Sequence, residues 1–410
     1  MMFKKKIKLL LPLLFCIAIA NAQTNIYKFK RQISGVNTIW HSISLPDELY
    51  KNANAGFEDL RIFGVSGKDT VEVPYLLKQR ADQINTKEVS FKQINQSTNE
   101  NGFYYTFQAP AGSTINQINL SFKQTNFDWQ VTLAGSNDNK EWFGILKNYR
   151  ILSIQNTDTD YKFTKLKFPD AKYQYFRIAI KCNVHPHLIA AKLNKTDTVG
   201  GVYKQANSLN YHLSNDAVQK QTVIEVNLKN PVPLSYLKLK AQSDFDFYRS
   251  FKIEAATDSF KSEKGMQYNY TGIYDGTISS LEETAFSFPN TITSKLRITI
   301  QNNDNKPLRI SNLELKGNAY EIIARFEDLK ANYAIYYGNE KSTAPSYEIE
   351  KFEKKIPTNL TTVSVGNEEK NPAYTIKTEK PLFENKIWLW VLMTIIIVLL
   401  GWFSFKMLKN

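Results

Sequence analysis

Histidines, carboxylates and aromatic rings are the side chains of this chain whose spacing could support chemistry. The sequence holds four histidines, and only the run His185-Pro186-His187 brings two of them together. Two imidazoles one residue apart on a strand could share a metal ion. The proline between them favours a loop instead, so we expect both histidines to be exposed and predict no metal site.

Adjacent carboxylates occur at Glu58-Asp59 and Glu282-Glu283. Neighbouring residues project to opposite faces of an extended strand, whereas a glycosidase needs two carboxyl groups facing each other across a cleft. The sequence contains no nucleophile elbow, no phosphate-binding glycine loop and no paired metal-binding cysteine motif. We therefore predict no catalytic residue and no cofactor, and an enzyme acting on envelope polysaccharide remains the second alternative function.

Aromatic residues with polar neighbours make the better case for ligand binding. Flat rings can stack on the C–H faces of sugars while amide and carboxylate groups bind hydroxyls. The predicted ligand-binding residues are Trp142, Phe143, Tyr149, Asn137 and Asp138. Trp129 continues the alternation of Val131 and Leu133, so it is expected in a core. Packing against the body of the domain is the competing, and favoured, interpretation of Trp142.

The elements that must position these residues are β-strands. β-branched and aromatic residues alternate with polar ones along most of the chain, and clusters of Asn, Asp, Gly, Ser and Pro interrupt them. This pattern is typical of an all-β protein, because Asn and Asp suit tight turns.

A repeat with a period of 120 residues organises the strands. It relates Phe168-Pro169-Asp170 to Phe288-Pro289-Asn290, and Phe176-Arg177-Ile178-Ala179-Ile180 to Leu296-Arg297-Ile298-Thr299-Ile300. Further upstream the offset slips by one, so that Phe107 to Pro110 matches Leu228 to Pro231, and Ile118-x-Leu120 matches Leu237-x-Leu239. Two copies of one domain are predicted, at residues 87–195 and 219–317, joined by a linker at 196–218.

The first copy reads Val131-x-Leu133-x-Gly135-Ser136-Asn137-Asp138-x-x-x-Trp142, followed by Tyr175-Phe176-Arg177-Ile178. It resembles the galactose-binding-like, discoidin-type β-sandwich, a jelly-roll found in many carbohydrate-binding modules. The second copy keeps the strands but lacks the Gly-Ser-Asn turn and the tryptophan. The resemblance implies tandem β-sandwiches, and it does not identify a ligand.

Two apolar segments bracket the chain. Residues 1–22 have a basic start, an apolar run and the end Ala20-Asn21-Ala22, as in a secretory signal peptide. A lipoprotein signal at Cys16 is the competing interpretation, which the bulky Phe15 opposes. Ile387–Phe405 runs nineteen residues without a charge, enough to span a membrane. The tail at 406–410 is basic, which places it in the cytoplasm and the region before it outside.

This topology changes the net charge and the number of cysteines expected in the exported region. Four lysines leave with the signal and three flank the membrane helix, so the formal charge of +13 falls to +6 over residues 23–385. Basic and acidic residues are interleaved there, and nucleic-acid binding is not expected. Cys182 is the one cysteine left after cleavage, so no internal disulfide is predicted.

The flanks of the repeats carry a second resemblance. Asp59-Leu60-Arg61-Ile62-Phe63 lies near the start, and Tyr333-Ala334-Ile335-Tyr336-Tyr337-Gly338-Asn339 lies near the end. With the two apolar segments, they look like an uncharacterised family of exported bacterial membrane proteins classed as a domain of unknown function. This resemblance implies a β-rich periplasmic region anchored to the inner membrane, without catalytic residues.

Together these observations predict an N-terminal β domain at 23–86, the two repeats, a C-terminal β unit at 318–365, a stalk at 366–386 and a membrane helix. The predicted function is a periplasmic binding or scaffolding protein, with an envelope glycan or a membrane protein as its partner. The first alternative is a non-catalytic subunit of an envelope membrane-protein complex.

Overall fold

The structure of the protein is a computed structural model that describes residues 24–157, 159–207, 209–263, 265–375 and 386–408. The predicted signal peptide and residues 376–385 of the predicted stalk lie outside these residues. The chain divides into two compact units. The terminal unit comprises Met1–Ile43, Asn52–Leu76 and Ile323–Asn410, and the repeat unit comprises Ser44–Lys51 and Leu77–Ile322.

The terminal unit is built from both ends of the sequence. Its elements are η1 (Thr24–Ile26), β1 (Phe29–Ser34), β2 (Trp40–Ser44), β3 (Arg61–Ser66), β4 (Asp69–Glu72), β5 (Tyr75–Gln79), β23 (Tyr320–Arg325), β24 (Asn332–Tyr337), η3 (Glu348–Lys355), β25 (Thr361–Thr362), β26 (Ser364–Val365) and β27 (Glu369–Lys370). One sheet has the order β26-β1-β24-β3-β4, with β27 also paired to β1, and the other has the order β25-β2-β23-β5. The predicted N-terminal and C-terminal β segments therefore share their sheets.

A buried carboxylate links the two flanking motifs. Asp59 is fully buried and accepts hydrogen bonds from the backbone N–H groups of Gly338 at 2.6 Å and Asn339 at 3.2 Å. Strand β3 pairs with β24 so that Ile62 lies opposite Ile335. Gly338 has a φ of +84°, a conformation that suits glycine. The two motifs thus meet in one core, which explains why the ends of the chain fold together.

Part of the predicted stalk belongs to this unit. Strand β27 pairs with β1, and the side-chain amide of Asn371 donates to the carbonyls of Thr24 at 2.7 Å and Tyr27 at 2.9 Å. A low content of apolar residues suggested a free spacer, but edge pairing uses backbone groups and needs few apolar side chains.

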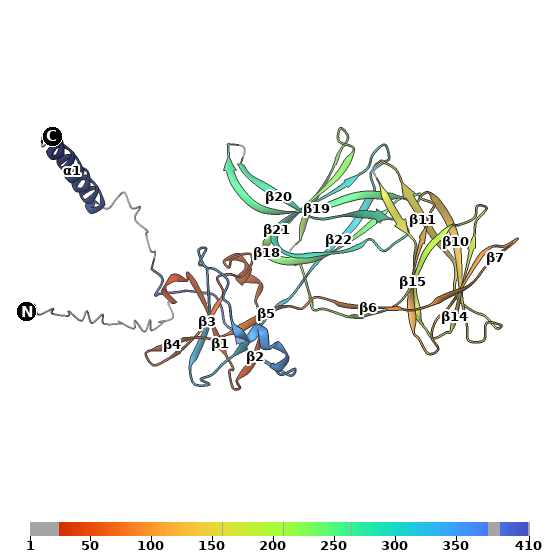
Figure 1. Cartoon of the computed structure of the whole chain (residues 1–410), viewed down its shortest axis with the longest axis horizontal. Helices are drawn as coiled ribbons and strands as arrows, with labels where there is room; N and C mark the ends of the chain where they lie inside the picture. The colour runs from red at the N-terminus through yellow and green to blue at the C-terminus, as the bar shows by residue number, and fades with distance from the viewer. Residues whose placement is uncertain (1–23, 158, 208, 264, 376–385, 409–410) are drawn as a thin grey trace, which may run out of the picture. The chain divides into compact units, whose positions relative to one another are not determined.

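The first repeat is a two-layered β-sandwich. Its strands are β6 (Gln83–Val89), β7 (Lys92–Asn99), β8 (Gly102–Gln108), β9 (Ile115–Phe122), β10 (Phe127–Ser136), β11 (Phe143–Gln155), β12 (Asp160–Phe163), β13 (Lys165–Ala171), β14 (Tyr175–Lys181) and β15 (Leu188–Val199). One sheet has the order β12-β11-β10-β14-β8-β7 and the other β13-β9-β15-β6. Figure 1 labels β10, β11 and β14 of the first sheet and β15 of the second. Ile118, Val131 and Ile178 are among the fully buried residues of the core between them.

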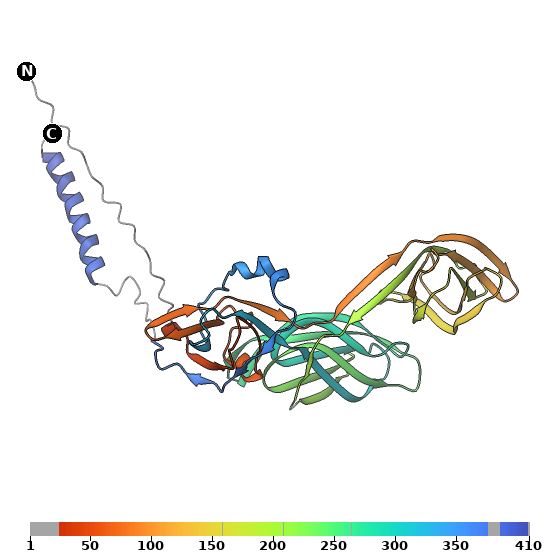
Figure 2. The ribbon, with the colours of Figure 1, turned by 90° about the horizontal axis from the view of Figure 1, so that it is seen from below.

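Strands β6 and β15 extend from this sandwich as a two-stranded ribbon (Figure 2). Its pairs run from Val89 opposite Leu193 to Gln83 opposite Val199. Most of its side chains are exposed, so the backbone ladder is its main internal support. Residues 196–199 of the predicted linker lie in this ribbon.

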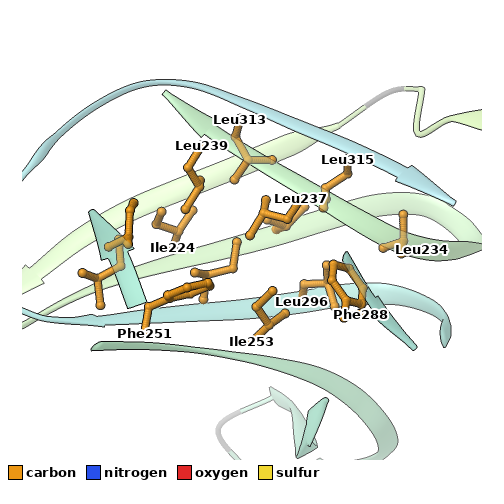
Figure 3. Close-up of a cluster of buried hydrophobic side chains, with 14 of the residues drawn as sticks. Ile224, Leu234, Leu237, Leu239, Phe251, Ile253, Phe288, Leu296, Leu313 and Leu315 are labelled. Atoms are coloured by element: carbon orange, nitrogen blue, oxygen red, sulfur yellow. The ribbon is translucent and has the colours of Figure 1, made fainter. Parts of the chain in front are cut away.

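The second repeat uses fewer, longer strands. They are β16 (Tyr203–Gln205), β17 (Asn210–Asp216), β18 (Gln221–Gln242), β19 (Tyr248–Ser262), β20 (Gly265–Ser279), β21 (Ala285–Gln301) and β22 (Arg309–Asn318), with η2 (Asp47–Lys51) also in this unit. The strand order is β16-β22-β18-β21-β19-β20, with β17 also paired to β18. The pairing of β18 with β21 shifts register between Asn227 and Val232, and again between Leu234 and Tyr236. Figure 3 shows Ile224, Leu237 and Ile253 among the apolar side chains gathered between these strands.

Strand register confirms the repeat. Val131 lies opposite Ile180 in the first copy, and Phe251 lies opposite Ile300 in the second, which is the predicted offset of 120 residues for both partners. One match was wrong. Phe107 pairs with Phe176, and Leu296 pairs with Val226, so Phe107 corresponds to Val226 and not to Leu228. Between β8 and β9 the first copy has a turn that includes Pro110, whereas the second copy has one continuous strand, β18, with a break in its pairing that includes Pro231.

Helix α1 (Lys386–Leu408) follows the terminal unit in sequence. Its segment Trp388–Leu408 is long and apolar enough to cross a membrane. The expected all-β chain of tandem β-sandwiches with one C-terminal apolar helix is therefore confirmed.

Candidate functional site

The predicted polar ligands Asn137 and Asp138 form the turn after β10. One carboxylate oxygen of Asp138 accepts hydrogen bonds from the backbone N–H groups of Lys140 at 2.8 Å and Glu141 at 2.9 Å. These bonds lower the pKa of Asp138. The side-chain oxygen of Asn137 accepts from the backbone N–H of Gln174 at 3.2 Å. Both side chains therefore use acceptor capacity to hold the turn.

Tyr149 packs toward the core. Its ring stacks on Phe163 with centroids 5.6 Å apart, and its hydroxyl donates to the carbonyl of Lys165 at 3.2 Å. Burial raises the pKa of Tyr149. It lies opposite Val131, a core residue, so the structure does not bring it together with the outward-facing rings.

Phe143 is the most exposed of the predicted aromatic residues of the first repeat. Its side chain is 48% exposed, and its ring lies nearly parallel to that of Tyr173, with centroids 6.1 Å apart. A Cβ at Gly135 would lie 2.1 Å from the Tyr173 ring, so only glycine lets this pair form beside β10. Trp129 stacks on Phe127 at 3.9 Å and packs against the core, as expected.

Trp142 stacks on an arginine. The guanidinium carbon of Arg177 lies 3.7 Å from the centroid of the indole ring. Phe176 and Ile178, on either side of Arg177 in β14, are fully buried in the core. Because side chains alternate along a strand, Arg177 projects from the outer face of the sheet. The planar cation and the indole therefore form a stacked pair on that face.

Strand pairing places five residues side by side across this outer face, and we call them the first row. They are Gly144, Ala134, Arg177, Thr106 and Asn95, in that order from β11 to β7. A Cβ at Gly144 would meet no atom within 4 Å, so the surface beside the stacked pair is open. Thr106 is 1% exposed, and its hydroxyl oxygen has no hydrogen-bond partner within the described part of the chain.

The second repeat contains a matching row. Its members, in the same strand order, are Gly272, Glu254, Arg297, Glu225 and His212. Tyr270 occupies the place of Trp142, two residues before the glycine, and the guanidinium carbon of Arg297 lies 4.0 Å from its ring centroid. Here the arginine also forms an ion pair with Glu225 at 3.3 Å.

Sequence reasoning does not single out Arg177, and for Tyr270 it favours strand packing over a ligand platform. In the sequence, Arg177 is part of a strand motif, and the 120-residue offset relates it to Arg297. Tyr270 lies on a hairpin arm whose length differs between the copies, so no sequence offset aligns it with Trp142. The signal that could have found the rows is an arginine inside two equivalent strands, where alternation forces it outward.

The histidine cluster lies before β15, where His187 is exposed as expected, whereas His185 is half-buried. The rings of His185 and His187 have centroids 4.6 Å apart, and Nε2 of His185 lies 3.0 Å from the side-chain nitrogen of Gln96. Among the described residues, no three His, Cys, Asp or Glu side chains gather in a way that would hold a metal ion.

Comparisons with known proteins bear on the fold. No family model matches the chain, and no curated protein matches it. Among solved structures, the CBM32-1 and CBM32-2 domains of Clostridium perfringens ZmpB in complex with GalNAc match 62% of this chain and 92% of their own, at 10% identity and a TM-score of 0.21. Allantoicase from Saccharomyces cerevisiae matches 57% of this chain and 90% of its own, at 8% identity and a TM-score of 0.22.

A glycoside hydrolase 29 family member from an unknown rumen bacterium matches 54% of this chain at 13% identity and a TM-score of 0.20, and the match spans 40% of that enzyme. The neighbours thus include two carbohydrate-binding modules of the type CBM32. The expected family of exported membrane proteins is not among these findings. TM-scores near 0.2 support no transfer of function, which must be argued from the residues themselves.

Proposed function

We propose that this protein is a membrane-anchored binding protein of the bacterial cell envelope whose first β-sandwich recognises a glycan. The observation that carries the proposal is the open outer face of the first repeat, where Trp142 stands beside the small residues Ala134 and Gly144. An aromatic ring beside small residues leaves room for the face of a sugar ring to pack against it. Asn95, at the end of the first row, is exposed, and its amide can bind hydroxyls.

Binding without catalysis is part of this proposal. The first row contains no carboxylate, and hydrolysis of a glycosidic bond needs a pair of them. The role is therefore to hold a polymer and not to cut it.

The location in the envelope rests on the two ends of the chain. Helix α1 would cross the inner membrane once, and the predicted signal peptide would export the sandwiches to the periplasm. Protease added to spheroplasts should then digest the repeats, while α1 stays in the carbonate-washed membrane. Digestion only after lysis would contradict this topology.

Binding is tested with the full chain in nanodiscs of zwitterionic lipid. Affinity electrophoresis measures how far soluble neutral and acidic polysaccharides slow the migration of the protein. The polymer that slows the wild-type protein should no longer slow the variant Trp142→Ala. Tyr270→Ala, at the equivalent place in the second repeat, is the matched control and should bind as wild type does. Absence of binding to every polymer, or full binding by the Trp142 variant, would refute the proposal.

A further inference from the structure

The two rows differ in charge although their arginines are equivalent. In the second row Arg297 has Glu225 on one side and Glu254 on the other. Glu225 forms an ion pair with Arg297 at 3.3 Å, and Glu254 forms one with Lys252 at 2.8 Å. The positive charge of Arg297 is therefore balanced within its own sheet.

In the first row both carboxylates are replaced. Ala134 stands where Glu254 does, and Thr106 stands where Glu225 does. Among the residues that the structure describes, the side chain of Arg177 makes no ion pair and no hydrogen bond; its guanidinium stacks on the indole of Trp142 and lies near the hydroxyl of Tyr104. Burial lowers the pKa of this guanidinium, which means that its charge is partly withdrawn from water without a counter-ion.

Thr106 provides the second observation. Its hydroxyl is buried beside Arg177 and has no partner in the described chain. Buried hydroxyls are normally paired, because an unpaired one loses its hydrogen bond to water without replacement. Arg177 thus lacks the carboxylate that Glu225 supplies to Arg297 in the other repeat, and the hydroxyl beside it also lacks an acceptor.

We infer that Arg177 binds a carboxylate of the ligand, and that the ligand is a uronic-acid polysaccharide. The inference rests on the proposed glycan-binding function and deepens it. A guanidinium offers two parallel N–H donors that match the two oxygens of a carboxylate. Trp142 covers the face of that guanidinium and leaves its edge for the ligand, while the ring of the sugar acid lies over Ala134 and Gly144.

The row favours a single planar anion. Arg177 is its one cationic member, whereas phosphate groups commonly attract several cations and backbone N–H groups. The second repeat already holds its own carboxylate at the equivalent place, so it is expected to bind no acidic ligand. One uronate site per chain follows.

The test compares two forms of one polymer. Full-length protein in zwitterionic nanodiscs is titrated calorimetrically with polygalacturonate and alginate fragments, and with the same fragments after chemical reduction of their carboxyl groups. Binding to an acidic fragment that weakens about tenfold or more on reduction supports the inference. Equal binding to both forms overturns it and leaves the proposed function standing. If the protein binds neither form and no other glycan, both the inference and the proposed glycan-binding function are overturned. Binding to peptides with a free C-terminal carboxylate, in place of glycans, also overturns both proposals.

A pair of equivalent variants locates the site. Arg177→Gln keeps hydrogen-bonding groups but removes the charge, and it should weaken binding of the acidic fragment about tenfold to a hundredfold. Arg297→Gln makes the same change in the second repeat and should leave the affinity as in wild type. Circular dichroism of both variants checks that the sheets are intact. An unchanged affinity in the Arg177 variant, or an equal loss in both, would overturn the inference.

Discussion

In the first repeat Leu133 lies opposite Ile178, and in the second Ile253 lies opposite Ile298, so the inward side chains keep one register in both copies. One residue further along the same strands, the outward side chains on either side of a shared arginine are uncharged in the first repeat and carboxylates in the second. The inward positions must fill a closed core, where a change of volume is costly, whereas the outward positions meet water. The comparison teaches that duplication can preserve a sandwich while one copy presents a cation and the other neutralises it.

The largest expected effect tests the shared half of this comparison. Ile178→Ala and Ile298→Ala each remove a fully buried side chain and should each cost about 2–5 kcal/mol of unfolding free energy. Hydrogen exchange of peptides from β14 and β21, measured in the full chain, reports the loss in each repeat separately. A cost below about 1 kcal/mol in one repeat alone would show that the two cores are not equivalent.

The next effect tests the difference. Thr106→Glu installs the carboxylate of the second row beside Arg177 and should weaken binding of an acidic fragment at least about tenfold, because the new glutamate satisfies the guanidinium. Thr106→Val is the matched control, since it removes the hydroxyl but adds no charge, and it should weaken binding only a few-fold. Equal affinities of wild type and the glutamate variant for the acidic fragment would show that a carboxylate beside the arginine does not distinguish the two rows.

The reverse exchange should create a site. Glu225→Thr combined with Glu254→Ala gives the second row the same residues on either side of its arginine as the first row has, and leaves Arg297 stacked on Tyr270. Calorimetry should then find a second, weaker binding site per chain, weaker because tyrosine is a smaller platform than tryptophan. If the number of fragments bound per chain stays unchanged, an arginine stacked on an aromatic ring between uncharged neighbours is not sufficient to bind a carboxylate.

Much of the fold could be predicted from the sequence, whereas of the site only Trp142 was predicted. Alternation and the 120-residue offset are local signals, and they give the strand class and the copies. The pairing of β1 with β24 depends on contacts between the two ends of the chain, which no local pattern encodes. The row around Arg177 depends on register across five strands, so Thr106 and Gly144 become neighbours of the arginine only after folding.

The smallest expected effect separates charge balance from stability. Glu225→Gln breaks the ion pair with Arg297. The side chain of Glu225 is 46% exposed and that of Arg297 is 36% exposed. Exposed ion pairs contribute about 0.2–1 kcal/mol, so local exchange protection in β18 should fall by no more than that. A small loss of stability with new weak binding of an acidic fragment would mean that Glu225 acts chiefly by occupying the arginine. A loss above about 2 kcal/mol would instead make the ion pair a structural requirement, and the missing carboxylate of the first repeat would then need a compensating contact.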